Sequence, residues 1–222
     1  SDLQKGAQIA VLDMQNRTIP QLKYSPSKLF YASDDAMCAE GIDLLWGAYK
    51  KREQLFNKLE PAFFPGNIFA YNKYTGENLP MFIAFIEEYV ELRQALSDET
   101  IRKLESLSRL ARKYGIHLVL AGQDWSKEET GVIKSQCHVK LSVKMNDHYQ
   151  SRMLLGFSGA ENLQNPGRAL SNQFGAVPFQ TYYVDEDAVG KILMGKVAQK
   201  SVEPVFLEQK SDYIPPRVNV LN

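Results

Sequence analysis

The feature that most constrains this chain is a series of short apolar runs, each ending on a polar residue. The clearest run covers residues 81–86 (Met-Phe-Ile-Ala-Phe-Ile), and two acids, Glu87 and Glu88, follow it directly. This run shows no alternation of apolar and polar residues, which is typical of a central parallel strand covered on both faces. Comparable runs predict further buried strands at residues 8–13, 28–32 and 116–123.

Segments with helical spacing of apolar residues separate these runs. Residues 34–59 predict a long helix because they contain no proline and begin with aspartates that can cap it. Residues 101–114 predict a second helix, and Gly115 would end it. Residues 61–80 are rich in Pro, Gly and aromatics and therefore predict an irregular connection.

The second half of the chain continues the same alternation. Strands are predicted at 139–145 and 176–184, and helices at 147–155 and 185–200. Together the elements predict an α/β fold, a three-layer sandwich with a mainly parallel sheet and right-handed crossovers. We expect one domain over residues 1–200 and an extended tail over 201–222.

Composition limits the class of protein and says little about its partners. The chain has 222 residues, is 44% hydrophobic, and carries 26 Lys and Arg against 26 Asp and Glu. It can bury a sizeable core, and its neutral balance excludes a basic coat of the kind that wraps nucleic acid. Cys38 and Cys137 lack the spacing of a zinc site, so we expect reduced thiols in a cytoplasmic setting.

Polar residues at the strand ends are the candidate functional residues. Ligands of parallel sheets bind beyond the carboxyl ends of the strands, and Asp13, the acid pair and Gln123 would share that edge. Glu87 could hold Mg²⁺, usually through water, and Glu88 could orient or polarise an attacking water. An amide such as Gln123 can contact both a γ-phosphate and that water. Taken singly, these residues fit an ordinary strand end and a loop-packing amide equally well.

Several motifs, in order along the chain, resemble the FtsK/SpoIIIE-type DNA-translocating ATPases. Residues 79–92 (LPMFIAFIEEYVEL) resemble the Walker B segment of that family, and residues 107–126 resemble the helix and sensor strand that follow it. The resemblance extends over about residues 7–190, with shorter similarities at residues 9–13, 46–56, 71–72, 151–155 and 165–168.

The resemblance implies a RecA-like motor domain that uses ATP and Mg²⁺. Such domains form a homo-oligomeric ring, usually a hexamer, and pump double-stranded DNA through its pore. Asp13, Glu87 and Gln123 would contact the nucleotide, with Glu87 at the magnesium position. Glu88 would activate water, and Arg152 would be the arginine finger that reaches a neighbouring subunit. Association with a membrane would come only through segments outside this chain.

One departure from the family pattern is serious. No Gly-x-x-x-x-Gly-Lys-Ser/Thr loop precedes the strand that ends at Asp13, so the chain alone is expected to bind ATP poorly and to be inactive. Residues 190–197 match seven positions of that pattern, but Val197 replaces the hydroxyl residue and the spacing predicts a helix interior. Glu87 also stands where the family usually has aspartate, which would alter the magnesium geometry.

Three functions are compatible with these motifs. The first is a DNA translocase motor for chromosome segregation or conjugative transfer, of which this chain would be a fragment. The second is the ATPase of a specialised, type VII-like protein-secretion system, whose tandem domains share the motifs. The third is a degenerate module that keeps the fold without catalysis.

Overall fold

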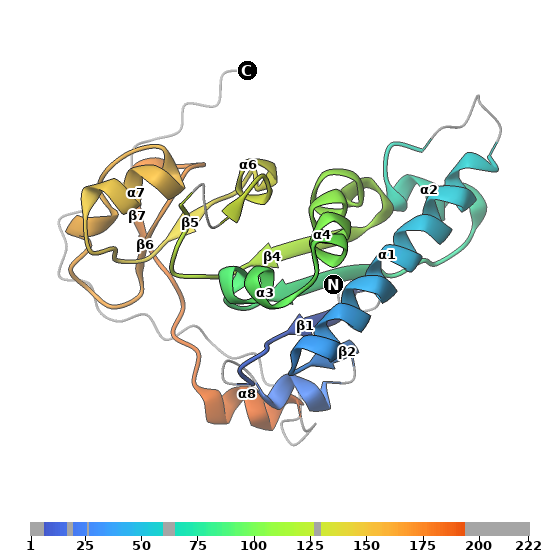
Figure 1. The fold of residues 1–222 in the computed structure, drawn as a ribbon, viewed down its shortest axis with the longest axis horizontal. Helices are drawn as coiled ribbons and strands as arrows, with labels where there is room; N and C mark the ends of the chain where they lie inside the picture. The colour runs from blue at the N-terminus through green and yellow to red at the C-terminus, as the bar shows by residue number, and fades with distance from the viewer. Residues whose placement is uncertain (1–6, 17–19, 26, 60–64, 127–129, 194–222) are drawn as a thin grey trace.

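The computed structural model describes residues 7–16, 20–25, 27–59, 65–126 and 130–193. Figure 1 shows a main sheet flanked by helices and a second, smaller sheet beside it. In chain order the elements are β1 (Ala7–Leu12), η2 (Pro20–Tyr24), β2 (Lys28–Ala32), α1 (Asp35–Asn57), α2 (Ile68–Thr75), β3 (Met81–Ile86), α3 (Tyr89–Ala95), α4 (Asp98–Leu110), η4 (Arg112–Tyr114), β4 (Ile116–Leu120), α6 (Ile133–Gln136), β5 (Leu141–Ser142), α7 (His148–Leu155), η5 (Ala160–Asn162), β6 (Arg168–Ser171), β7 (Gly175–Gln180) and α8 (Glu186–Leu193).

Four parallel strands form the main sheet in the order β2-β1-β3-β4. β1 and β3 align without a shift, from Ala7 opposite Met81 to Leu12 opposite Ile86. Because all four strands run in one direction, their carboxyl ends lie along one edge of the sheet. The predicted mainly parallel α/β fold is confirmed, with β1 and β3 as the two inner strands.

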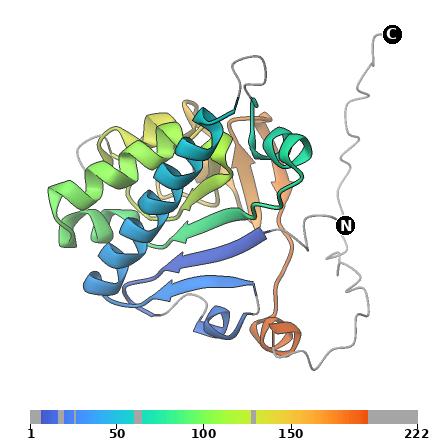
Figure 2. The ribbon, with the colours of Figure 1, turned by 90° about the vertical axis from the view of Figure 1, so that its right-hand side faces the viewer.

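Helices α1 and α4 cover one face of the main sheet (Figure 2). α1 begins where the carboxylate of Asp34 accepts a hydrogen bond from the N–H of Met37 at 2.8 Å. Gly41 allows α1 to approach β2 closely, because a Cβ at this position would lie 2.6 Å from the Phe30 ring. The predicted helix at 34–59 is therefore confirmed, and its buried side chains belong to the main core.

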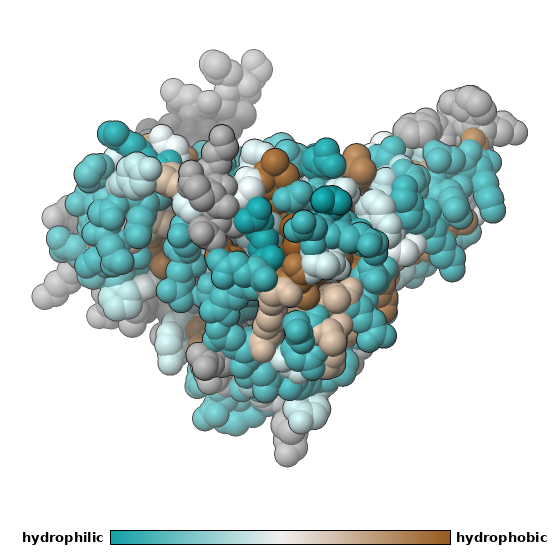
Figure 3. Space-filling view, viewed as in Figure 1, coloured by the Kyte–Doolittle hydropathy of each residue, from teal (hydrophilic) through white to brown (hydrophobic). Residues whose placement is uncertain are grey.

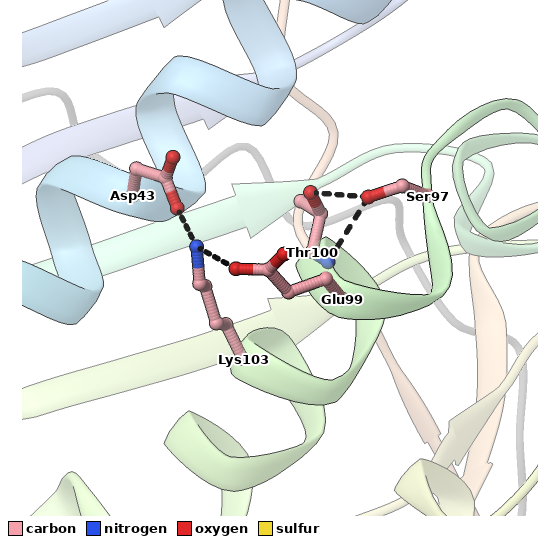
Figure 4. Close-up of polar contacts among 5 residues, drawn as sticks. All are labelled: Asp43, Ser97, Glu99, Thr100 and Lys103. Atoms are coloured by element: carbon pink, nitrogen blue, oxygen red, sulfur yellow. Dashed lines mark hydrogen bonds and ion pairs between the residues drawn. The ribbon is translucent and has the colours of Figure 1, made fainter.

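Polar contacts also join α1 to α4 (Figure 4). The ammonium of Lys103 lies 2.8 Å from the carboxylate of Asp43 on α1 and 3.1 Å from that of Glu99 on its own helix. Surface ion pairs of this kind add little to stability, so the apolar face supplies most of the packing energy. The outer surface of these helices is mostly hydrophilic (Figure 3).

Arg52 on α1 ties together the amino ends of β3 and β4. Its guanidinium donates to the carbonyls of Tyr114 at 2.7 Å and Pro80 at 2.6 Å, and the residue is only 5% exposed. Burial lowers the pKa of this guanidinium to about 10. Because the carbonyl dipoles and the Phe82 ring, 4.1 Å away, face the cation, Arg52 holds the start of both strands in place.

The prediction of an irregular connection at 61–80 is wrong, because helix α2 lies within it. Asn67 caps this helix by accepting from the N–H of Ala70 at 3.0 Å, and Gly76 ends it in the left-handed conformation. Tyr71 stacks on Phe56 with ring centroids 4.6 Å apart. Tyr71 thus lies on the buried face of this short helix, together with Ile68, whereas Phe69 and Tyr74 are exposed.

The prediction that β3 is covered on both faces is also wrong. Phe85 is 39% exposed and its neighbour in register on β4, Val119, is 45% exposed. Both alternate along their strands with side chains of the core shared with α1 and α4, so they lie on the opposite face of the sheet. An unbroken apolar run therefore does not by itself establish equal cover on both faces.

The second sheet is antiparallel, in the order β5-β6-β7. The strand predicted at 139–145 shortens to β5, and β6 was not predicted. The predicted helix at 147–155 is confirmed as α7, capped by Asp147 and ended by Gly156. The small core between the second sheet and α7 consists of Leu154, Leu155, Ala160, Leu163 and Leu170.

Helix α8 bears on whether residues 190–197 are a phosphate loop or the interior of a helix. Gly190 lies inside this helix, as predicted for a segment that only mimics a phosphate loop. The rest of that segment and the predicted tail at 201–222 fall outside the described residues. Within the described ranges, no helix is long and apolar enough to cross a membrane.

Candidate functional site

A pocket of about 250 Å³, here called the acidic pocket, opens at the carboxyl edge of the main sheet. Asp13 follows β1, the acid pair follows β3, and Gln123 follows β4. The ends of β1 and β3 are joined where the N–H of Glu87 donates to the carbonyl of Leu12 at 2.9 Å. The structure therefore brings four of the five predicted residues together, and the full lining is Asp13, Met14, Gln15, Glu87, Glu88, Glu91 and Gln123.

Glu88 has an unusual backbone conformation. Its φ of 46° and ψ of 62° lie in the left-handed region, where residues other than glycine are uncommon. The conformation is held because the carbonyl of Glu88 accepts from Leu92, while the next N–H, of Tyr89, donates to Ala121 at 3.0 Å. Strained conformations of this kind often occur at functional sites, where the surrounding structure maintains them.

The amide of Gln123 contacts Glu88 directly. Its Nε2 donates to Oε1 of Glu88 at 3.0 Å, across the gap between the ends of β4 and β3. Both side chains reach solvent in part, and both line the acidic pocket. A small molecule in the pocket would therefore meet a carboxylate and an amide that are already oriented toward each other.

Asp13 lies deeper than the other acids and is 1% exposed. Its Oδ2 accepts a hydrogen bond from the hydroxyl of Tyr31 at 2.8 Å. Burial, and then the contact with Asp13, raise the pKa of Tyr31 above its ordinary value, so the phenol stays protonated and acts as a donor. Sequence reasoning assigned no role to Tyr31, because a tyrosine near the end of an apolar run gives no signal of its own.

The outer part of the acidic pocket holds a second pair that sequence reasoning missed. Nε2 of Gln15 donates to Oε2 of Glu91, which links the turn after β1 to helix α3. Glu91 lies three residues after Glu88, so a helical count from the acid pair could have suggested it.

Arg152 is the predicted residue that the structure does not bring to this pocket. It lies exposed on α7, beside the second sheet, and does not line the acidic pocket. This placement is compatible with a contact to another subunit, and that role stays a prediction.

The oxygen ligands of the acidic pocket suit Mg²⁺ held in part by water. Among the described residues, no three His, Cys, Asp or Glu side chains converge tightly enough to hold a metal ion by themselves. Mg²⁺ is usually bound by one or two carboxylates together with water and substrate phosphates, so a tight protein cage is not required. Glu87 and Asp13 could hold such an ion, and Lys and Arg are absent from the described lining.

The edge of β4 borders a larger groove, of about 590 Å³. Within the described residues no strand pairs with this edge, because β4 is the last strand in the order. The N–H of Ala121 donates to Ile86 on β3, so the backbone groups of Leu118 and Leu120 point away from β3 and toward the groove. Opposite them, residues 136–141 form the other wall.

Comparisons with known proteins were made by sequence and by fold. No model of a protein family matches the chain. The DNA translocase FtsK of Caldanaerobacter subterraneus subsp. tengcongensis is 32% identical over 153 residues, which are 66% of this chain and 22% of that protein. The DNA translocase SpoIIIE of Bacillus subtilis is 29% identical over 195 residues, 82% of this chain and 23% of that protein. The chain thus spans about a fifth of the length of these relatives.

Solved structures show the same fold. The pCW3 conjugation coupling protein TcpA, solved with ATPγS, matches with a TM-score of 0.70 and 24% identity over 87% of this chain and 58% of that chain. EssC (ATPases 2 and 3) of Geobacillus thermodenitrificans matches with a TM-score of 0.69 and 19% identity over 86% of this chain and 37% of that chain. With sequence and fold in agreement, the chain is a homologue of the FtsK/SpoIIIE DNA translocases and has the RecA-like α/β fold of such ATPases.

Proposed function

We propose that this chain is part of an ATP-driven motor that moves double-stranded DNA, as the names of its relatives indicate for those proteins. The observation that carries the proposal is the contact between Gln123 and the strained Glu88 inside a pocket of carboxylates. This arrangement supplies an acid, an amide and a magnesium position at the edge where nucleotides bind in parallel α/β sheets.

Three residues of the acidic pocket have separate tasks in this proposal. Glu87 holds Mg²⁺ through water, and the ion would neutralise charge on the phosphates. Glu88 accepts a proton from, or orients, the attacking water, and Gln123 holds that water and the γ-phosphate in line. Arg152 acts on the site of a neighbouring subunit in a homo-oligomeric ring, which we infer to be a hexamer.

The phosphate-binding loop would come from a strand added to the edge of β4 with which no described strand pairs. The outward-facing backbone groups of Leu118 and Leu120, and the groove beside them, support this position. A parallel strand there would end next to Gln123, at the same edge as the acidic pocket. Its loop could then reach the phosphates of a nucleotide whose magnesium is held by Glu87.

The test is ATP hydrolysis by a longer protein that includes this chain and a phosphate loop before it. We expect Mg²⁺-dependent turnover that rises when double-stranded DNA is added, and Glu88→Gln should lower the rate by about 10²-fold or more. Glu40→Gln, an exposed glutamate on α1, is the matched control and should keep the full rate. Absence of Mg²⁺-dependent turnover, or an unchanged rate in Glu88→Gln, would contradict the proposal.

A protein-secretion ATPase is the second candidate. Its support is the fold similarity to EssC and to the type VII secretion ATPase EccC of Thermomonospora curvata, which matches with a TM-score of 0.64 and 16% identity over 96% of this chain and 26% of that chain. The response of ATP turnover to DNA distinguishes the two candidate functions. A turnover rate that does not change when double-stranded DNA is added would favour the secretion ATPase.

A further inference from the structure

Tyr31 does not line the acidic pocket, but its hydroxyl contacts Asp13, which does. The hydroxyl lies 2.8 Å from Oδ2 of Asp13, and both residues are nearly buried, at 8% and 1% exposure. The backbone also joins the ends of β1 and β2, because the N–H of Asp13 donates to the carbonyl of Ala32 at 2.9 Å. Side chain and backbone thus fix Asp13 from two directions.

The chemistry of the donor matters in this pocket. The phenol of Tyr31 is a neutral donor, so it binds the Asp13 carboxylate without adding a positive charge to the site. The nearby cation, Lys23, lies over the Tyr31 ring, with its Nζ 4.8 Å from the ring centroid. A neutral donor orients Asp13 and leaves the negative charge of the pocket available to a bound cation.

A turn shapes the same corner of the pocket. The N–H of Asn16 donates to the carbonyl of Asp13 at 2.9 Å, and Asn16 adopts a left-handed φ of 53°. The turn directs Met14 and Gln15 into the pocket lining. Asp13 lines the same pocket as Glu87 and Glu88, and we expect a bound ion to lie among these three residues.

We propose that Tyr31 is a positioning residue for the nucleotide site. Its hydroxyl holds the Asp13 carboxylate toward Mg²⁺ and phosphate bound in the acidic pocket. The inference rests on the proposed function and goes beyond it, since it assigns a task to a residue that no motif marks.

The experiment measures binding of Mg·ADP by titration calorimetry to the longer protein with a phosphate loop. Tyr31→Phe keeps the ring and removes the donor, and we expect affinity to fall about tenfold, as for loss of a hydrogen bond to a charged group. Tyr24→Phe is the matched control, because Tyr24 is 70% exposed, and it should leave affinity unchanged. Tyr31→Met serves the same purpose if Tyr31→Phe does not fold.

A double-mutant cycle shows whether Tyr31 acts through Asp13. In an Asp13→Asn background, Tyr31→Phe should cause little further loss of affinity, because the carboxylate that it orients is gone. Losses that simply multiply would overturn the inference, as would a Tyr31→Phe protein with a lower Tm and unchanged affinity. If the unmodified protein binds no Mg·ADP, the proposed function itself fails, and the two failures are thereby distinguished.

Discussion

The main sheet and the second sheet differ in how much apolar surface holds them together. The main sheet packs on α1 and α4 through a large cluster that includes fully buried Leu12, Leu45 and Leu104. The second sheet packs on α7 through a few residues, such as Leu154 at 6% exposure. The difference suggests that the acidic pocket lies on a rigid support, whereas Arg152 is carried by a part of the molecule that opens more easily.

Matched truncations of leucine would break this comparison most directly. Leu104→Ala, in the main core, should lower the free energy of unfolding by about 4 kcal/mol, and Leu154→Ala by about 2 kcal/mol. Leu154 is itself buried, and the smaller loss is expected because its small cluster can relax around the cavity more completely. Chemical denaturation measures both values. Hydrogen exchange should further show that Leu154→Ala speeds exchange in β5, β6 and α7 and leaves β1 and β3 protected. Equal losses at the two sites would remove the distinction.

Two glycines with positive φ provide a second comparison. Gly115, before β4, has a φ of 75°, and a Cβ there would lie 2.6 Å from Cδ1 of Ile68. Gly156, after α7, has a φ of 90° and open space around it. We expect Gly115→Ala to lower the free energy of unfolding by about 3 kcal/mol and Gly156→Ala by about 1 kcal/mol. Both alanines would have to adopt a left-handed backbone conformation, but only the Cβ at residue 115 would clash with another side chain. Thermal unfolding that ranks the two variants in the opposite order would contradict the packing described at α2.

A smaller effect concerns the pH dependence of the main sheet. Burial, and then the charge of Arg112, lower the pKa of His117 on β4 below its ordinary value of 6.5. As pH falls through 6.5 the unfolded chain takes up this proton first, so His117 makes the folded state less stable below that pH and has no such effect above it. His117→Gln should therefore reduce the loss of stability between about pH 7.5 and about pH 5.5.

The control for this measurement is a histidine beside the second sheet. His148 is exposed at the start of α7, and His148→Gln is the matched variant for the same measurement. A loss of pH dependence in His148→Gln, with none in His117→Gln, would show that acid acts first on the second sheet.

Sequence patterns predicted the four strands of the main sheet and, in the second sheet, β7 and the position of β5 but not β6. Unbroken apolar runs identified β1, β2, β3 and β4, and capping residues identified α1 and α7, because these signals are local. β6 escaped notice because a four-residue strand is too short for a pattern. α2 escaped because its turn-forming neighbours dominate the window, and its stability depends on the distant Phe56.

The candidate site also contains residues that the sequence predicted and residues that it did not. Asp13, Glu87, Glu88 and Gln123 were visible as polar residues at strand ends, and the parallel sheet brings them into one pocket. Their catalytic and binding tasks stay predictions. Tyr31 and the Gln15–Glu91 contact could not be predicted, because each depends on residues that meet only after the strands align.

The sequence by itself determined the strands of the main sheet, the long helices and the residues at the strand ends, since these follow from spacing and local propensity. Only the tertiary structure decided that Glu88 takes a left-handed conformation against Gln123, that Tyr31 donates to a buried Asp13, and that Arg152 lies outside the pocket. These outcomes depend on contacts between residues far apart in the chain, and such contacts are fixed by strand register and side-chain packing, which no local pattern specifies.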